Sequence, residues 1–523
     1  MAVPERATSE SDERRWIALL LFAALVVRLA WLGELATLPW AEQLPTDSFL
    51  YDQAARRIAT GDWQLGDQPL RMSPAYFYVV GLVHLVCGSG VWSIRLLQVA
   101  AGVATVFVTW RVAKQLVTAR WALLAAGLVA FAGPLVFFDG AILPESLSTL
   151  LLVSVAWLSL QCLEREDQAR SPWRSWAALG LALGLLSALR PNAILLLPVS
   201  MLFAWRAPVD RAERTRRAAS VLIAAMIAIA PITARNAIAS GRFVPLTSHG
   251  GVNLFVGNGP GANGTFRVPA EVPGGGSPST QFDAFREAAS QAIGHEVDEA
   301  ESDAYWQRRT LAHVSAHPLD ATVLVARKIH LLFNARELGL VLPYAFSREA
   351  TRTMGAPLVQ SGWLAPFALV GLLLALCARR DDDEARVTRE RTVATITLVF
   401  ALSVALVFVT DRYRAPLLPL FAVHAVSLIE RVASAARARA WRFVGVIGLA
   451  FALAVALAVP VRANQHFERE WLALGDGFLE LDEPSRALDA YQHALALAPE
   501  DPLARRGIER ATAASGGVDP RGR

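Results

Sequence analysis

Long apolar segments, separated by short charged loops, make up most of this chain of 523 residues. A helix needs about 20 mostly apolar residues to cross the hydrocarbon core of a bilayer. Eleven segments come near that length, so we predict that each of them spans a membrane. They are residues 16–33, 96–112, 121–138, 146–163, 175–190, 192–206, 218–234, 362–378, 392–410, 416–430 and 443–460.

Arginine predicts the orientation of these segments, because short cytoplasmic loops are enriched in Lys and Arg. Two further apolar stretches, 73–90 and 321–335, are placed on the membrane surface rather than across it. The Arg-dense short loops then all fall on the cytoplasmic side, at 111–120, 164–174, 206–217, 379–391 and 431–442. This topology predicts a multi-pass protein of the inner or plasma membrane, with the N-terminus inside and the C-terminus outside.

The predicted fold is an α-helical polytopic membrane protein with juxtamembrane helices on its outer face. Its parts are a cytoplasmic tail (1–15), a membrane module (16–233), a large outer loop (234–361), C-terminal membrane helices (362–460) and an extracytoplasmic unit (464–515). Within the large loop, residues 241–246 follow a turn and predict a strand, whereas 303–317 predict an amphipathic helix ended by Pro318. Glycines 274–276 predict a flexible stretch. The large loop is therefore expected to be mixed in secondary structure.

Residues 468–501 form a unit of 34 residues with a regular spacing of large and small side chains. The pattern is made by Trp471, Leu474, Gly475, Phe478, Ala487, Tyr491, Ala494 and Pro499. It resembles the tetratricopeptide repeat, with Phe and Tyr interchanged. One repeat cannot bury its own apolar face, so we expect this helical hairpin to dock on the outer loop or on a protein partner through residues 468–515. A helical hairpin unrelated to the repeat is the alternative.

Charge content argues against nucleic-acid binding, and the cysteines argue against a disulfide or a cysteine-bound metal. Lys and Arg number 50 against 46 Asp and Glu, and the basic residues lie in short loops rather than on one face. We therefore predict no nucleic-acid partner. The three cysteines, Cys87, Cys162 and Cys377, lie in apolar segments and predict neither a disulfide nor a metal site.

Three carboxylates lie at the outer ends of predicted spans, where a charge is costly and therefore indicates a site. Asp47 follows the first span, and Asp139 and Glu145 lie at the junction of two later ones. Each has a structural alternative. Asp47 could cap the helix predicted at 49–59, Glu145 could be a helix-start carboxylate favoured by the helix dipole, and Asp139 could belong to a turn.

Several arginines also fall on the predicted outer face, against the positive-inside bias. They are Arg95, Arg190, Arg412 and Arg414. A lipid phosphate at the outer leaflet is the anion that guanidinium groups would hold there, in bidentate fashion. For Arg95 the alternative is snorkelling towards the interface.

The order and sidedness of these motifs resemble the polytopic GT-C glycosyltransferases over about residues 15–430. The resemblance is strongest to the bacterial relatives of protein O-mannosyltransferases and of lipid A aminoarabinose transferases. The segment 71–76 resembles the family's Pro-Pro juxtamembrane motif, although it lacks the His and the first Pro of that motif. The other matching features are Asp47, Glu145 and the segments 94–97, 189–192, 235–236, 250–254, 257–258 and 412–416.

This resemblance implies a transferase that takes a sugar from a polyprenyl-phosphate donor to an extracytoplasmic lipid, glycan or protein acceptor. Asp47 is the expected base for the acceptor hydroxyl. Glu145 is the expected second catalytic carboxylate, which orients the sugar or shares a divalent cation with Asp47, although two carboxylates do not establish a metal. The four arginines would bind the donor phosphate. Further substrate contacts are expected from Asp139, Tyr76, Asn192 and Asn236.

Two other functions fit the same sequence. One is an oligosaccharide ligase, which shares the lipid donor but moves a preassembled glycan. The other is a non-enzymatic membrane scaffold or transporter that uses the repeat as its binding module. Transporters place charges near the bilayer midplane and repeat their spans, whereas the charges here lie at the outer face.

Overall fold

The computed structural model describes residues 10–167, 173–206, 209–274, 278–340, 343–378, 384–459 and 467–516. These residues are almost entirely helical, and they contain no strand apart from one isolated bridge between Ala132 and Val359. The predicted flexible glycines 275 and 276 lie outside the described residues.

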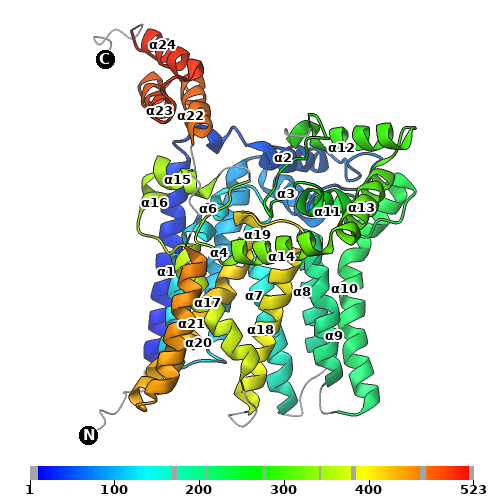
Figure 1. Cartoon of the computed structure of the whole chain (residues 1–523), viewed down its shortest axis with the longest axis vertical. Coiled ribbons are helices and arrows are strands. Elements are labelled where there is room, and N and C mark those ends of the chain that lie inside the picture. The colour runs from blue at the N-terminus through cyan, green and yellow to red at the C-terminus, as the bar shows by residue number, and fades with distance from the viewer. Residues whose placement is uncertain are drawn as a thin grey trace.

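A bundle of roughly parallel helices forms the body of the molecule (Figure 1). Its helices are α1 (Glu10–Leu35), α4 (Val91–Ala113), α5 (Ala119–Ala130), α7 (Glu145–Asp167), α8 (Trp173–Leu189), α9 (Leu196–Arg206), α10 (Arg211–Ser240), α17 (Ser361–Cys377), α18 (Glu384–Ala405), α20 (Leu418–Arg437) and α21 (Trp441–Ala458). Each predicted span therefore overlaps at least one bundle helix.

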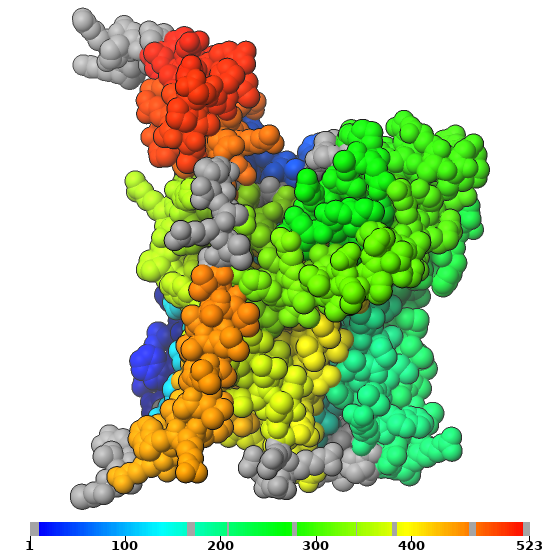
Figure 2. Space-filling view, viewed as in Figure 1, coloured from blue at the N-terminus to red at the C-terminus, as the bar shows by residue number. Residues whose placement is uncertain are grey.

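Six candidate spans among the described residues have the length and composition to cross a membrane. They are Glu10–Leu35, Val91–Ala113, Glu145–Glu164, Arg211–Ser240, Asp411–Arg437 and Trp441–Ala458. Shorter apolar helices accompany them, among them α3 (Pro74–Cys87). α21 lies on the outside of the bundle (Figure 2) and exposes Val446, Leu449 and Leu453, as a lipid-facing helix would. The multi-pass membrane character is thus supported, while the count of eleven spans stays a prediction.

Small residues set the spacing between bundle helices. Gly180 and Gly184 lie four residues apart on α8, and a Cβ atom at either position would overlap the backbone of α10, at Val221 or at Ala225. This small-xxx-small pattern lets two membrane helices approach closely without loss of packing. α10 itself begins at Asp210, whose side chain accepts a hydrogen bond from the Glu213 amide, and ends at Gly241 in the left-handed conformation.

The predicted span 121–138 is not one helix. It is divided into α5 and α6 (Gly133–Gly140), and the break pairs with a distant segment. The Gly133 amide donates to the Val359 carbonyl at 2.9 Å, and the Val359 amide donates to Phe131 at 2.8 Å. Pro134, in the first turn of α6, has no amide hydrogen to continue the helix. This tertiary pairing provides hydrogen-bond partners for backbone groups that have none within the interrupted helix.

Shorter helices lie over one end of the bundle (Figure 1). We call the group formed by α2 (Thr46–Ala59), α3, α11 (Gly250–Asn258), α12 (Pro278–Ile293) and α13 (Glu299–Ala316) the cap. The remaining elements near this end are η1 (Pro39–Ala41), η2 (Pro191–Leu195), α14 (Pro318–Phe333), α15 (Tyr344–Ala350), α16 (Arg352–Gly355), α19 (Asp411–Arg414) and η3 (Ala415–Leu417).

The strand predicted at 241–246 is wrong. This segment consists of bends and irregular backbone, and the amide side chain of buried Asn236 donates to the carbonyls of Val244 and Leu246 at 3.1 and 2.9 Å. The amphipathic helix expected at 303–317 is confirmed as α13, and Pro318 both follows it and begins α14. In the predicted outer loop, the regular secondary structure that the structure describes is therefore helical, joined by irregular segments.

Buried polar contacts hold the cap together. Asp303 of α13 accepts from the amides of Gly251 and Val252 in the first turn of α11, at 2.7 and 3.1 Å. Burial raises the pKa of the Asp303 carboxyl to about 6, although both amide bonds oppose that shift. Arg71, before α3, pairs with Glu299 at the start of α13. These contacts join α13 to α11 within the cap, and they join α13 to the loop before α3.

The C-terminal unit consists of α22 (Glu468–Glu480), α23 (Pro484–Leu497) and α24 (Pro502–Gly516). Gly475 allows the ring of Tyr491 to pack closely against α22, at the spacing that the sequence pattern uses. The unit docks near η1, where Gln43 donates to Glu480 at 2.6 Å and Arg486 donates to the Thr37 carbonyl at 2.7 Å. The predicted helical hairpin is present, while its assignment as a tetratricopeptide repeat stays a prediction.

Removal of residues 464–523 tests whether this unit serves chemistry or docking. The unit contributes no residue to the cavity described below, so we expect the truncated protein to keep activity within about tenfold of the full chain. A loss of that size corresponds to about 1.4 kcal/mol. Transfer to a small acceptor, normalised to folded protein, measures it. A well-folded but inactive truncation would place the unit in the active site.

Sidedness is tested by reporter fusions along the chain. The start of α1 and the C-terminal unit lie at opposite ends of the bundle (Figure 1). We expect fusions after Arg120 and Arg217 to report cytoplasm and fusions after Gly259 and Arg523 to report the outside, because the Arg-dense loops stay inside. An outside signal at Arg120 would mean that residues 73–90 span the membrane.

Candidate functional site

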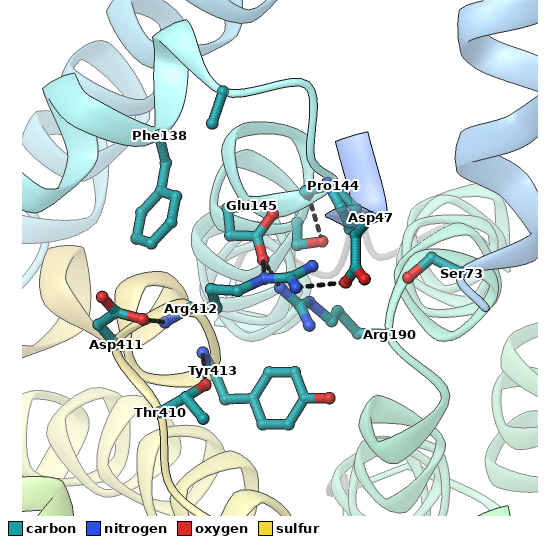
Figure 3. A network of polar contacts seen from close by, with 12 residues as sticks. Asp47, Ser73, Phe138, Pro144, Glu145, Arg190, Thr410, Asp411, Arg412 and Tyr413 are labelled. Atoms are coloured by element: carbon teal, nitrogen blue, oxygen red, sulfur yellow. Dashed lines mark hydrogen bonds and ion pairs between the residues drawn. The ribbon is translucent and has the colours of Figure 1, made fainter. Parts of the chain in front are cut away.

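Four charged side chains from distant parts of the chain meet between the bundle and the cap (Figure 3). Arg412 is central: its Nη1 donates to Asp47 Oδ2 at 2.6 Å and its Nε donates to Glu145 Oε1 at 2.6 Å. Arg190 Nη2 donates to the same Glu145 oxygen at 2.5 Å. We call these four residues the charge cluster. Two carboxylates and two guanidinium groups balance one another in it.

Each member of the charge cluster stands at a helix end. Asp47 lies in the first turn of α2 and Glu145 in the first turn of α7, where the helix dipole favours a negative charge. Arg190 links α8 to η2, and Arg412 belongs to α19, which Thr410 caps by accepting from the Tyr413 amide. The capping alternative for Asp47 does not hold, because the cap position of α2 is Pro45 and no side chain bonds there.

A cavity of about 450 Å³ opens next to the charge cluster. It reaches Asp47, Arg190 and Arg412, but not Glu145. The Asp47 side chain is 22% exposed, whereas that of Glu145 is fully buried. Asp47 is therefore the carboxylate that a ligand in the cavity can reach, whereas Glu145 binds the two arginines on their buried side.

The two walls of this cavity differ in chemistry. The bundle wall comes from η2, the end of α18 and the residues that follow it, and most of its side chains are apolar: Leu195, Val404, Leu406, Val407 and Phe408. Val407 and Phe408 also pack into the apolar core of the cap. The cap wall carries polar and aromatic side chains: Arg71, Ser73, Thr247, His249, Asn253, Gln281 and Phe282. The two arginines of the cluster stand on the bundle side, while Asp47 stands on the cap side with α2.

Aromatic rings fix the orientation of the cluster. The Arg190 guanidinium lies 4.9 Å from the ring centroid of Tyr413, and Phe408 stacks on that ring at 5.4 Å. Such a cation–π contact holds a guanidinium without using up its hydrogen-bond donors. Tyr51 lines the cavity beside Asp47, and burial, followed by the Asp47 carboxylate, raises the pKa of its phenol well above the usual value. Tyr51 is therefore a neutral hydroxyl at neutral pH.

Two of the predicted phosphate-binding arginines do not reach the cavity. Arg95 donates to the carbonyls of Gly140 and Ala41, at 3.0 and 2.7 Å. Arg414 donates to the Asn334 carbonyl at 2.6 Å and pairs with Glu337. Both guanidinium groups are buried and hold backbone segments in place, so we leave them out of the proposed site.

Asp139, Tyr76 and Asn236 also lie outside the cavity. Asp139 forms a buried ion pair with Arg28 at 2.7 Å, which ties α6 to α1. Tyr76 donates to Gln98 at 2.5 Å and packs edge-on against the Tyr51 ring. Asn236 donates to the two carbonyls named above, and its Oδ1 accepts from the Leu70 amide and from the Arg235 guanidinium, each at 3.1 Å. These three side chains bond to other protein groups outside the cavity, so we assign them a structural role and no contact with a ligand.

Asn192 does line the cavity, and it donates to the Ser403 hydroxyl at 2.7 Å. Several other lining residues were missed in the sequence. Tyr51, His249 and Gln281 carry no motif of their own. They reach the site from α2, from the N-cap of α11 and from α12, through the fold of the cap. The Gly-rich segment before Asn253 was the one signal for that region.

The charge cluster does not fit a divalent metal. Among the described residues no group of three or more His, Cys, Asp or Glu side chains is arranged to hold an ion. Asp47 and Glu145 are joined through the Arg412 guanidinium, which occupies the position that a bridging cation would need. No step is therefore assigned to a metal.

Comparison with known proteins supports a glycosyltransferase. Residues 67–234 match the family described as dolichyl-phosphate-mannose-protein mannosyltransferase. This mannosyltransferase match covers about a third of the chain and supports the GT-C resemblance seen in the sequence. It includes Glu145 and Arg190 of the charge cluster, while Asp47 and Arg412 lie on either side of it.

Solved structures give more distant likenesses. The archaeal oligosaccharyltransferase AglB from Archaeoglobus fulgidus, in complex with an inhibitory peptide and a dolichol-phosphate, is 13% identical, with a TM-score of 0.46 over 91% of this chain and 60% of the AglB chain. ArnT from Cupriavidus metallidurans, bound to undecaprenyl phosphate, is 15% identical, with a TM-score of 0.34 over 81% of this chain and 79% of ArnT. This chain thus spans about 60% of the length of AglB. No curated protein sequence matches it significantly.

Proposed function

We propose that this chain is a membrane glycosyltransferase that moves a sugar from a polyprenyl-phosphate donor to a hydroxyl group of an extracytoplasmic acceptor. The observation that carries the proposal is the charge cluster, in which an accessible carboxylate faces a cavity next to two arginines. The family description also supports it, because it names a sugar held on a polyprenyl phosphate.

The bundle wall suits the donor. Arg190 and Arg412 offer two guanidinium groups side by side, the arrangement that binds phosphate oxygens in bidentate fashion. Leu195 and Leu406, at 40% and 50% exposed, continue the wall as an apolar surface. A polyprenyl chain would lie against this surface while its phosphate meets the arginines.

Asp47 suits the role of general base. Its carboxylate is accessible from the cavity, and the 2.6 Å bond from Arg412 fixes its orientation. In the proposed step the acceptor hydroxyl gives its proton to Asp47, and its oxygen forms a bond to the anomeric carbon of the sugar. The bond from that carbon to the phosphate oxygen breaks, and the phosphate leaves with the electron pair. The arginines stabilise the charge that develops on it.

Glu145 acts through the arginines. One of its oxygens accepts from both Arg190 and Arg412, and its side chain is fully buried. A buried carboxylate between two guanidinium groups keeps them together against their mutual repulsion. We therefore assign Glu145 a positioning role.

A transfer assay tests the proposal. Membranes that contain the protein are incubated with a radiolabelled polyprenyl-phosphate sugar and with the envelope fraction of a deletion strain. We expect label to pass into the envelope fraction, and membranes of the deletion strain serve as the control. Equal labelling with both membranes would overturn the proposal and favour a scaffold or transporter.

Conservative Arg to Lys variants separate donor ligands from structural arginines. Arg190→Lys keeps the charge but loses the planar fork, so we expect the donor KM to rise about tenfold, the size of one charge-assisted hydrogen bond. Arg95→Lys and Arg414→Lys are the matched controls, and they should lower thermal stability while leaving the donor KM unchanged. An unchanged donor KM in Arg190→Lys would remove that residue from the donor site.

A further inference from the structure

The cap wall carries hydrogen-bonding groups that the protein itself does not use. The described residues offer no hydrogen-bond partner to the side chains of His249, Asn253 or Gln281, although all three line the cavity. His249 is 7% exposed and holds its ring edge-on against Phe282 at 4.6 Å. His249 is buried, whereas Asn253 and Gln281 are half-buried, so their side chains are available to a polar ligand in the cavity.

The charges of the cap-wall side chains indicate which class of ligand the wall can bind. Burial, and then the nearby Arg71, lower the pKa of His249 to about 3, so its imidazole is neutral at physiological pH. The Arg71 charge is already matched by Glu299, and its guanidinium lies 5.1 Å from the Phe282 ring centroid. Asn253 and Gln281 are neutral and can each donate and accept. A neutral ligand rich in hydroxyl groups fits these side chains better than an anion or an acyl chain.

The position of Asp47 decides which substrate faces this wall. Direct displacement needs the attacking hydroxyl on the side of the anomeric carbon opposite the leaving phosphate. Arg190 and Arg412 place the phosphate on the bundle side of the cavity. The acceptor must therefore approach from the cap side, where Asp47 can take its proton.

We infer that the cap wall is an acceptor subsite and that the acceptor is a saccharide, bound through Asn253, Gln281 and His249 beside the rings of Phe282 and Phe266. The apolar faces of sugar rings pack on aromatic side chains, and their hydroxyls pair with amides. One mode of binding an extended peptide adds it to a free strand edge, and the described cap helices offer no such edge. The inference rests on the proposed function and names the substrate class of the same site.

Linkage analysis of the product tests the inference directly. The radiolabelled product formed on the envelope fraction is isolated, and the atom that carries the new sugar is identified by methylation analysis and by protease digestion. Label joined to a sugar hydroxyl supports the inference. Label joined to Ser or Thr of a protein, as the family description would suggest, or to a non-sugar lipid group, overturns it. If the protein transfers no label at all, the proposed function fails instead.

Kinetics of an Asn253→Ala/Gln281→Ala double variant give the second readout. Both residues lie in helices that accept Ala. The loss of two hydrogen bonds is expected to raise the half-saturating amount of acceptor about tenfold, with the donor KM unchanged. Gln291→Ala, on the exposed side of the same α12 helix, is the matched control and should leave both values unchanged. A rise in the donor KM instead would assign the subsite to the donor's sugar, and no change in either value would also overturn the inference.

Discussion

Asp47→Asn is expected to lower the transfer rate by about 100- to 10,000-fold, the range typical of the loss of a general base. Asn has nearly the same size, and its side-chain oxygen can still accept the bond from Arg412. The donor KM should therefore stay close to that of the native protein, while kcat falls. Initial rates at saturating donor and acceptor, normalised to folded protein, measure the effect.

Asp62→Asn is the control for this change. Asp62 lies in the same predicted outer loop as Asp47 and pairs with Arg57 at 2.5 Å on the protein surface, outside the cavity. An exposed pair of this kind contributes little to stability, so its variant should transfer sugar at the normal rate. Native turnover in Asp47→Asn would refute the assignment of Asp47 as the base.

Arg412→Lys is the second change with a large expected effect. The Arg412 fork bonds Asp47 and Glu145 at once, each at 2.6 Å, and lysine cannot reproduce that geometry from a single ammonium group. We expect kcat to fall about 100- to 1,000-fold, as it does when one preorganised donor is removed from a transition state. Turnover and the melting temperature of the detergent-purified protein are measured together.

A double-variant cycle tests whether Glu145 and Arg412 act as one unit. Glu145→Gln removes the charge that holds Arg412 and Arg190 together, so its effect on kcat should not add to that of Arg412→Lys. Additive losses would mean that Glu145 and Arg412 act independently. In that case the ion pair described here is not the unit that positions the phosphate-binding groups.

The sequence and the structure agree on the charge cluster for a physical reason. A charge at the end of a membrane span is costly unless it is paired or functional. That rule selected Asp47, Glu145, Arg190 and Arg412 from segments far apart in the chain. The same rule also selected Arg95, Arg414 and Asp139, and it could not separate them, because a buried arginine that binds carbonyls and one that faces a cavity look alike in sequence.

The sequence by itself determined the class of fold, because apolar segments of membrane-crossing length leave the helix as the structure that satisfies every backbone group in lipid. It also determined the helical C-terminal unit, through its spacing of small and aromatic residues. The tertiary structure alone decided which arginines face the cavity, where α5 ends, and that His249, Asn253 and Gln281 share one wall. The first two outcomes depend on contacts between segments more than a hundred residues apart, such as Phe131 with Val359 and Asp47 with Arg412, and no local pattern encodes such contacts.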